Sequence, residues 1–262
     1  LSMRIRNLEE ELNLTLIQRG QRFEGFTPEG ERILAWARAV LAAHDGLAAE
    51  AAICRGQMVG QLRVGMVPLA SLNPMQLIKP LAEKYPALQF SLLSMTSEQI
   101  IDGVSRNQLD LGICYLQHLD ERLFKIARLP QTRMGLLHDK RHFDFSAGTP
   151  GWDTLAALPL GFLTKGMYYR ESIEISFKAK GLTPTSVFES DSTFQIIQAV
   201  QAGICCAIMP LNNGLEALSD NLEILPIAES QVDSQLALIM RQQEPVSSLA
   251  EKCFAEAQGI FG

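Results

Sequence analysis

The first residues of the chain carry apolar side chains at the spacing of a helix. Leu1, Ile5, Leu8 and Leu12 are three or four positions apart, which places them on one side of an amphipathic helix. Residues 18–26 are mainly polar and include two glycines and two arginines, a composition typical of a short hairpin or loop. The chain is therefore expected to start within a helix and to turn before residue 27.

A strong helix start follows at Thr27 and Pro28. Threonine is a good N-cap, proline fits the first helical position, and the two glutamates that follow favour the positive end of the helix dipole. Only Gly46 interrupts the pattern up to about residue 52, which predicts a helix of about 25 residues. One side of this helix carries Ile33, Trp36, Val40 and Leu47. An apolar side of this length predicts a partner helix.

From Gln61 onward, strand-like apolar runs alternate with helix-like segments, which predicts an α/β fold. Strands are expected near residues 62–67, 88–94, 109–114, 133–138, 159–163, 186–189, 204–209 and 236–241. Helices are expected near residues 74–84, 97–106, 168–180, 192–202 and 247–258. Pro80 falls inside the first of these helices, so that helix either begins late, near Leu77, or is kinked.

The composition narrows the class of protein. The chain has 262 residues, of which 47% are apolar and 20% charged, which suits one split domain or two and excludes disordered, collagen-like and disulfide-dense chains. No apolar run reaches the roughly 20 residues that a membrane span needs, and the first residues are too charged for a secretory signal. A cytoplasmic protein without a membrane partner is expected. With a net charge of −6, any contact with nucleic acid should be local.

The reactive side chains form no recognisable catalytic or metal-binding motif. The five cysteines include no CxxC pair and have no histidine at ligand spacing, which favours buried free thiols over a redox switch. Cys205 and Cys206 are adjacent in a predicted strand, so their side chains should point to opposite faces. Nucleophile elbows, phosphate-binding loops and zinc-protease motifs are absent from the sequence. An enzyme is unsupported, and neither a cofactor nor a metal is expected.

A specific run of residues spans the first helix, the loop and the start of the long helix. It consists of Leu1, Ser2, Ile5, Leu8, Glu9, Leu12, Asn13, Leu16, Ile17, Arg19, Phe26, Thr27 and Gly30. This run resembles the DNA-binding domain of the LysR-type transcriptional regulators, in which a recognition helix is followed by a wing and by a linker helix that opens with Thr-x-x-Gly. Ile17 stands where the family usually has phenylalanine, a core exchange that should be tolerated.

The resemblance continues through the remainder of the chain. The segments that carry it are Gly60–Gly65, Lys84–Pro86, Leu109–Ile113 and Gln201–Pro210. Cys205 replaces the usual second glycine of the last segment and puts a side chain where the family leaves room. Family members begin with a helix and the first half of a helix-turn-helix before the position of Leu1, so the chain is expected to open within the recognition helix.

The resemblance implies a DNA contact by the first helix and the loop after it. The implied residues are Ser2, Met3 and Arg6 toward the groove, with Arg19 and Arg22 on the phosphates. A recognition helix presents its N-terminal side chains to base edges, and flanking arginines neutralise phosphates. The alternative is that Arg4 and Arg6 pair with the glutamates at positions 9–11 on a solvated helix.

For residues 60–262 the resemblance implies an effector domain of the periplasmic-binding-protein type II fold, with two α/β lobes and a small molecule held between them. Independently, several predicted helices begin at polar residues directly after strands, and converging helix N-termini would suit a carboxylate or similar small anion. Ordinary N-capping is the competing interpretation. The expected effector contacts are Asn73, Ser97 and Ser192 at these helix starts and Ser71 in the first strand-to-helix loop, with Lys165 as a cation. The resemblance adds Thr96 and Thr164, which match positions where the family places ligand-contacting residues. Tyr168 and Tyr169 either line the mouth of the cleft or pack beneath it.

The sequence as a whole predicts a DNA-binding regulator of the LysR type that binds a small-molecule effector and forms a homodimer or homotetramer through Ile33, Trp36, Val40 and Leu47. The expected parts are a partial winged helix-turn-helix at 1–27, a linker and dimerisation helix with its hinge at 28–59, one lobe at 60–131 plus 237–262, and a second lobe at 132–236. The alternative is a stand-alone solute-binding protein of the same fold, which would be secreted and would lack the long helix. A third candidate is an enzyme that uses the cleft for catalysis.

Overall fold

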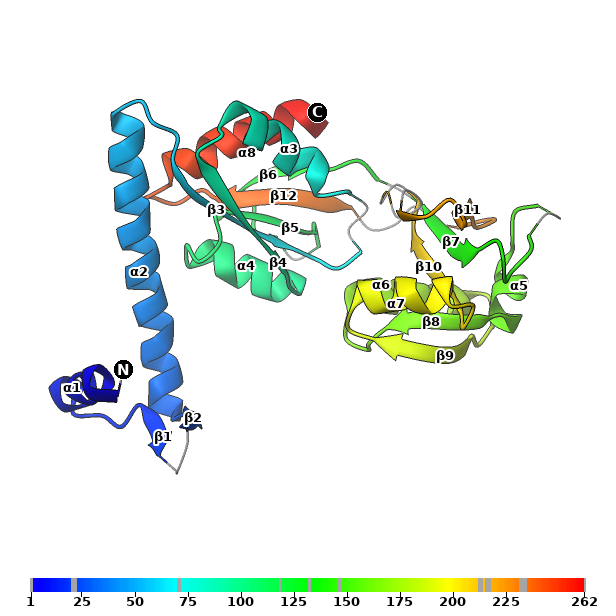
Figure 1. The fold of residues 1–262 in the computed structure, drawn as a ribbon, viewed down its shortest axis with the longest axis horizontal. Helices are drawn as coiled ribbons and strands as arrows, with labels where there is room; N and C mark the ends of the chain where they lie inside the picture. Colours follow the sequence, from blue (N-terminus) through cyan, green and yellow to red (C-terminus); the bar gives the residue numbers. More distant parts are fainter. Residues whose placement is uncertain are drawn as a thin grey trace.

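The computed structural model describes residues 2–19, 23–69, 72–117, 119–131, 133–145, 148–211, 214, 218–230 and 235–261. Figure 1 shows a small N-terminal unit, one long helix and two α/β lobes. The long helix stands beside the first lobe, and the second lobe lies on the opposite side of the first lobe (Figure 1). The predicted two-lobe α/β fold preceded by a long helix is confirmed.

The N-terminal unit contains α1 (Ser2–Leu12), β1 (Ile17–Arg19) and β2 (Phe23–Phe26). Glu9 joins the helix to the hairpin, because its buried carboxylate accepts hydrogen bonds from the backbone N–H groups of Leu16 at 2.7 Å and Ile17 at 3.2 Å. Arg6 pairs with the exposed Glu10 at 3.2 Å, so one arginine–glutamate pair of the solvated-helix alternative is present.

The long helix, α2, spans Pro28–Cys54, and Thr27 caps it by accepting a hydrogen bond from the Gly30 N–H at 2.9 Å. Gly30 packs directly against the hairpin, where an added Cβ would lie 2.0 Å from the carbonyl oxygen of Leu16. Only glycine fits this contact, because a backbone carbonyl cannot yield as a flexible side chain can. Among the helices that the structure describes, none is both long enough and apolar enough to span a membrane.

The first lobe is built on a five-stranded sheet in the order β4–β3–β5–β12–β6. Its strands are β3 (Gly60–Met66), β4 (Leu88–Ser94), β5 (Leu111–Tyr115), β6 (Phe124–Arg128) and β12 (Leu236–Arg241), and its helices are α3 (Met75–Lys84), α4 (Ser97–Ser105) and α8 (Ser248–Phe261). β3 is parallel to β4 and β5, whereas β12 is antiparallel to β5 and β6. Helix α3 begins at Met75 and contains Pro80, so the late start near Leu77 is wrong.

The second lobe carries a five-stranded sheet in the order β11–β7–β10–β8–β9. Its strands are β7 (Met134–Asp139), β8 (Pro159–Leu163), β9 (Thr185–Ser190), β10 (Cys206–Pro210) and β11 (Leu222–Pro226), and its helices are α5 (Trp152–Ala157), α6 (Tyr168–Ala179) and α7 (Thr193–Gln201). One hydrophobic cluster packs α5 and α6 against this sheet, and another packs α7.

The chain passes between the two sheets twice. It leaves the first sheet after Arg128 and enters the second at Met134, and it returns between Pro226 and Leu236. Leu236 pairs with Tyr115 in the first sheet, so the first lobe resumes one residue before the expected boundary at 237. Three short elements, β6, β11 and α5, lie outside the segments that the sequence pattern predicted.

The two adjacent cysteines sit on opposite faces of the second sheet, as predicted. Cys206 belongs to the cluster under α5 and α6, and Cys205 belongs to the cluster under α7. A Cβ at Gly161 would lie 2.7 Å from Cys205 Sγ, so the sulfur occupies the space over a glycine of the neighbouring strand. Burial raises the pKa of the Cys205 thiol to about 11, which keeps it protonated at neutral pH.

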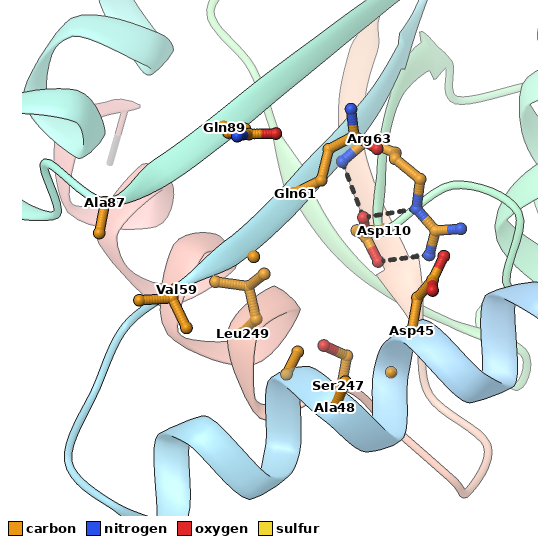
Figure 2. Close-up of a pocket in the computed structure, with 13 residues that line it drawn as sticks. Asp45, Ala48, Val59, Gln61, Arg63, Ala87, Gln89, Asp110, Ser247 and Leu249 are labelled. Atoms are coloured by element: carbon orange, nitrogen blue, oxygen red, sulfur yellow. Dashed lines mark hydrogen bonds and ion pairs between the residues drawn. The ribbon is translucent and has the colours of Figure 1, made fainter.

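Helix α2 meets the first lobe at a pocket of about 480 Å³, drawn in Figure 2. Arg63 and Asp110 form its polar wall, and Asp110 accepts hydrogen bonds from the Arg63 backbone N–H at 2.7 Å, from Nε at 3.0 Å and from Nη2 at 2.9 Å. Burial lowers the pKa of the Arg63 guanidinium, but the hydrogen bonds and charge of Asp110, together with the charge of Asp45 on α2, more than offset this effect and raise it. On the other side of the junction, the Ser248 hydroxyl donates to Glu50 of α2 at 2.8 Å.

We predict that Asp110→Ala lowers the free energy of unfolding by about 2–4 kcal/mol, because it leaves a half-buried guanidinium and a backbone N–H without their acceptor. The control is Asp102→Ala, which breaks an exposed pair with Arg106 and should cost less than about 1 kcal/mol. Chemical denaturation of both variants measures the difference, and equal losses would contradict a special role for Asp110.

Candidate functional site

A cavity of about 250 Å³ lies between the two lobes. Its lining residues are Val67, Pro68, Thr96, Ser97, Glu98, Tyr115 and Gln117 from the first lobe and Gly166, Met167, Tyr168, Tyr169 and Glu171 from the second. Small-molecule sites in proteins commonly measure about 300–1,000 Å³, so this cavity suits a small ligand.

The first-lobe wall is the start of helix α4. Thr96 is its N-cap and forms a capping box with Gln99, because the Thr96 hydroxyl accepts from the Gln99 N–H at 3.4 Å and Gln99 Oε1 accepts from the Thr96 N–H at 3.0 Å. The Ser97 hydroxyl accepts a hydrogen bond from the backbone N–H of Tyr115 at 3.4 Å. These contacts fix the start of α4 against the end of β5.

The second-lobe wall is the turn after β8 and the first turn of α6. Gly166 has a φ of +86°, a value that favours glycine, and α6 then starts at Tyr168 without a side-chain cap. Arg170 points away from the cavity into the second lobe, where it lies 2.6 Å from Glu174 and stacks over the Phe162 ring at 4.0 Å. The cavity therefore receives tyrosines and a glutamate from α6, but no guanidinium.

Tyr168 bridges the two lobes beside the cavity. Its hydroxyl donates a hydrogen bond to Gln117 Oε1 at 3.0 Å, and its ring centroid is 4.0 Å from that of Tyr115. It packs against the hydrophobic core of the first lobe, although it belongs to a helix of the second. Tyr168 lines the cavity, and Tyr169 does so too while its side chain is buried in the second lobe.

The structure brings together only part of the effector set expected from the sequence. Thr96 and Ser97 line the cavity, and Ser71 lies outside the described residues. Thr164 and the exposed Lys165 precede Gly166 but are not among the described lining residues. The two remaining residues are engaged in local contacts, since Ser192 caps α7 by accepting from the Gln195 N–H at 3.5 Å and Asn73 accepts from the Met75 N–H at 3.0 Å.

Sequence reasoning missed the lining residues Tyr115, Gln117 and Glu171. Tyr115 ends a fully buried strand whose residues resemble core, and Gln117 follows it in a segment without a pattern. For Tyr115 and Gln117, the signal that could have identified them was their position at and just beyond the carboxyl end of a parallel strand, because ligands in α/β sheets gather at that edge.

The residues expected at DNA and at the dimer contact lie on the surface wherever they are described. Met3 is 76% exposed, and Arg6 is also exposed. The side chains of Ser2 and Arg19 and the whole of Arg22 lie outside what the structure describes. On α2, the exposed fractions are 74% for Trp36, 67% for Val40 and 71% for Leu47, whereas Ile33 is half-buried.

The described lining of the cavity combines polar, aromatic and apolar side chains. It offers hydroxyls, an amide, tyrosines and two carboxylates, but no cysteine, lysine or histidine. Across the described part of the chain, no three histidine, cysteine, aspartate or glutamate side chains gather in a way that could hold a metal ion.

Comparison with known proteins agrees with this architecture. The chain is 25% identical to the HTH-type transcriptional regulator EstR of Acinetobacter baylyi over 252 residues, covering 95% of this chain and 83% of EstR. The LysR family regulator CbnR has the same fold, with a TM-score of 0.74 at 18% identity over 100% of this chain and 89% of CbnR. In the complex of full-length CbnR with its target DNA, the TM-score is 0.71 at 20% identity, over 98% of this chain and 88% of CbnR. The effector binding domain of QuiR in complex with shikimate matches with a TM-score of 0.62 at 16% identity, over 78% of this chain and 97% of that domain.

The family model described as the LysR substrate binding domain matches residues 55–260. This match includes both lobes and the cavity between them, and the named relatives are transcriptional regulators. The chain therefore belongs to the LysR family and is a DNA-binding transcriptional regulator with a two-lobe effector-binding domain.

Proposed function

We propose that the cavity between the lobes is the effector site of this regulator. The observation that carries the proposal is its two-sided lining, with Thr96 and Ser97 on one lobe and Tyr168 and Glu171 on the other. A ligand held there contacts both lobes at once. The QuiR domain, which has the same fold, was solved with shikimate bound, which supports a small molecule as the occupant.

The lobes, taken as 60–131 plus 236–262 and 132–235, would then change their relative orientation with the ligand. Contacts between described residues cross from lobe to lobe, since Tyr168 packs on the first lobe and Leu69, from the loop after β3, packs into both hydrophobic clusters of the second. A ligand shifts such an equilibrium by its difference in affinity for the two arrangements. Ligand contacts with Tyr168 would bias the angle between the lobes.

We predict that Thr96→Val weakens binding of a polar effector by roughly 1–3 kcal/mol, because the ligand loses a hydrogen-bond partner. Ser192→Ala is the matched control, because Ser192 and Thr96 are both N-caps but only Thr96 lines the cavity. Each variant should lose about 1 kcal/mol of folding stability with its cap. A thermal-shift screen of organic acids, amines and amides identifies the ligand, which at 100 times its dissociation constant stabilises the fold by about 2.7 kcal/mol. Calorimetry then compares the variants, and equal affinities would place the ligand elsewhere.

We propose that two copies of the chain pair through the exposed apolar side of α2. Trp36, Val40 and Leu47 are each at least two-thirds exposed in the single chain, and these residues lie along the helix at intervals of four and seven positions. A continuous apolar stripe on a 27-residue helix is the surface that helix pairing buries.

Replacing Trp36 and Val40 together with glutamate should dissociate the dimer, because two charges would enter the helix contact. Sedimentation of the double variant beside an Arg38→Glu control, a change at a polar position of the same helix, measures the effect. An unchanged association state of the double variant would rule out this face.

We propose that α1 reads DNA and that the segment after it contacts the backbone. Arg6→Ala should reduce the preference for the target sequence. Arg22→Ala should weaken binding to all sequences and reduce the slope of log affinity against log salt by about one, because a phosphate contact carries no sequence information. Binding titrations at several salt concentrations distinguish the two, and identical behaviour would refute the assignment.

The rival functions receive less support. A solute-binding protein of this fold has no use for α2 or for the Gly30 contact that seats it on the hairpin. The described cavity lining offers no nucleophile activated by a base, so we propose a regulator without catalytic activity. Because its partner is DNA, we place it in the cytoplasm.

A further inference from the structure

The charges around the effector cavity share one sign. Among the lining residues that the structure describes, the charged ones are Glu98 and Glu171, one from each lobe. Both side chains are exposed rather than buried in ion pairs, and the described salt bridges involve neither of them. The cavity therefore presents negative charge to its contents from both sides.

Arg170 and Lys165, the described cationic residues closest in sequence to Glu171, do not offset the negative charge of these carboxylates. Arg170 has a 6% exposed side chain and lies 2.6 Å from Glu174 and 4.0 Å from Glu189. Lys165 is exposed and is not among the described lining residues. An anionic ligand would meet two glutamates without a described cationic side chain to pair with.

The helix starts at the cavity do not reverse this sign. Glu98 lies in the first turn of α4 and Glu171 in the first turn of α6, where a carboxylate offsets the partial positive charge of the helix N-terminus. At α4 the capping box also satisfies backbone N–H groups that an anion would otherwise use. Each helix thus places a carboxylate of its own first turn at the cavity.

Aromatic rings are the second feature of the cavity that suits a cation. Tyr115, Tyr168 and Tyr169 all line the cavity, and tyrosine faces attract organic cations through the ring quadrupole. A second cavity of about 290 Å³ shares Val67 and Pro68 with the first and is otherwise lined mainly by apolar residues, including Leu92 and Leu93. Carboxylates and tyrosines beside a second, mainly apolar cavity suit a cation that carries a carbon skeleton.

We propose that the effector of this regulator is an organic ammonium ion, whose charge lies near Glu98 and Glu171 and whose carbon atoms contact the tyrosines. This inference rests on the proposed function, since it names the ligand class of the same cavity. It differs from the carboxylate that the helix starts alone suggested.

The test uses matched probes and the full chain. Choline is compared with its uncharged isostere dimethylbutanol, and phenylethylammonium is compared with phenylpropionate, by thermal shift and calorimetry. We expect at least one ammonium probe to bind and its uncharged or anionic counterpart to bind at least about tenfold more weakly. The Glu98→Gln/Glu171→Gln double variant should lose about tenfold in affinity for that probe.

Glu83→Gln, which removes an exposed carboxylate on α3 outside the cavity, is the control and should bind within about twofold of the unmodified protein. Circular dichroism establishes that each variant is folded. Unchanged ammonium affinity in the double variant, or no binding by either ammonium probe, would overturn the ligand class. If phenylpropionate alone binds and Thr96→Val weakens it, the ligand class is wrong but the cavity remains the effector site.

Discussion

The contact between Arg63 and Asp110 determines how the regulator is assembled. Asp110 is buried and accepts three hydrogen bonds from Arg63, which locks the middle of β3 to the start of β5 in the first sheet. The charge of Asp45 on α2 acts on the same guanidinium (Figure 2). The linker helix is therefore seated on the end of the two strands that this ion pair joins.

The other end of the same two strands lies at the cavity between the lobes. Val67 follows β3 directly, and Tyr115 is the last residue of β5, so both reach the cavity. A strand of only five to seven residues therefore separates the junction with α2 from the cavity. Strands rise about 3.3 Å per residue, which makes this path about 20 Å long. In the proposed mechanism, the central sheet keeps both ends in fixed relation and the second lobe moves, held by two crossovers and by the reciprocal contacts of Tyr168 and Leu69.

The sequence predicted the parts of the fold that depend on local chemistry and missed those that depend on distant pairing. Thr27, Pro28 and Gly30 specify the start of α2 by capping and by close packing, and buried β5 and β10 stand out as apolar runs. β6 and β11 are edge strands with polar residues between their apolar ones, so each has one neighbour and only a weak signal of its own. The strand near 236–241 was predicted, but no local pattern reveals its pairing with β5, in which Leu236 lies opposite Tyr115.

The cavity shows the same division between local and non-local information. Ser97 could be found because helix starts after strands are visible in sequence, and Thr96 because its position matches one where the family places ligand contacts. The sign of the site's charge could not, because it depends on which first-turn residues meet across the lobes and where Arg170 points. A glutamate in the first turn is ordinary helix chemistry by itself. When two such turns from different lobes face one cavity, the same glutamates that stabilise their own helices also determine the charge that a ligand meets.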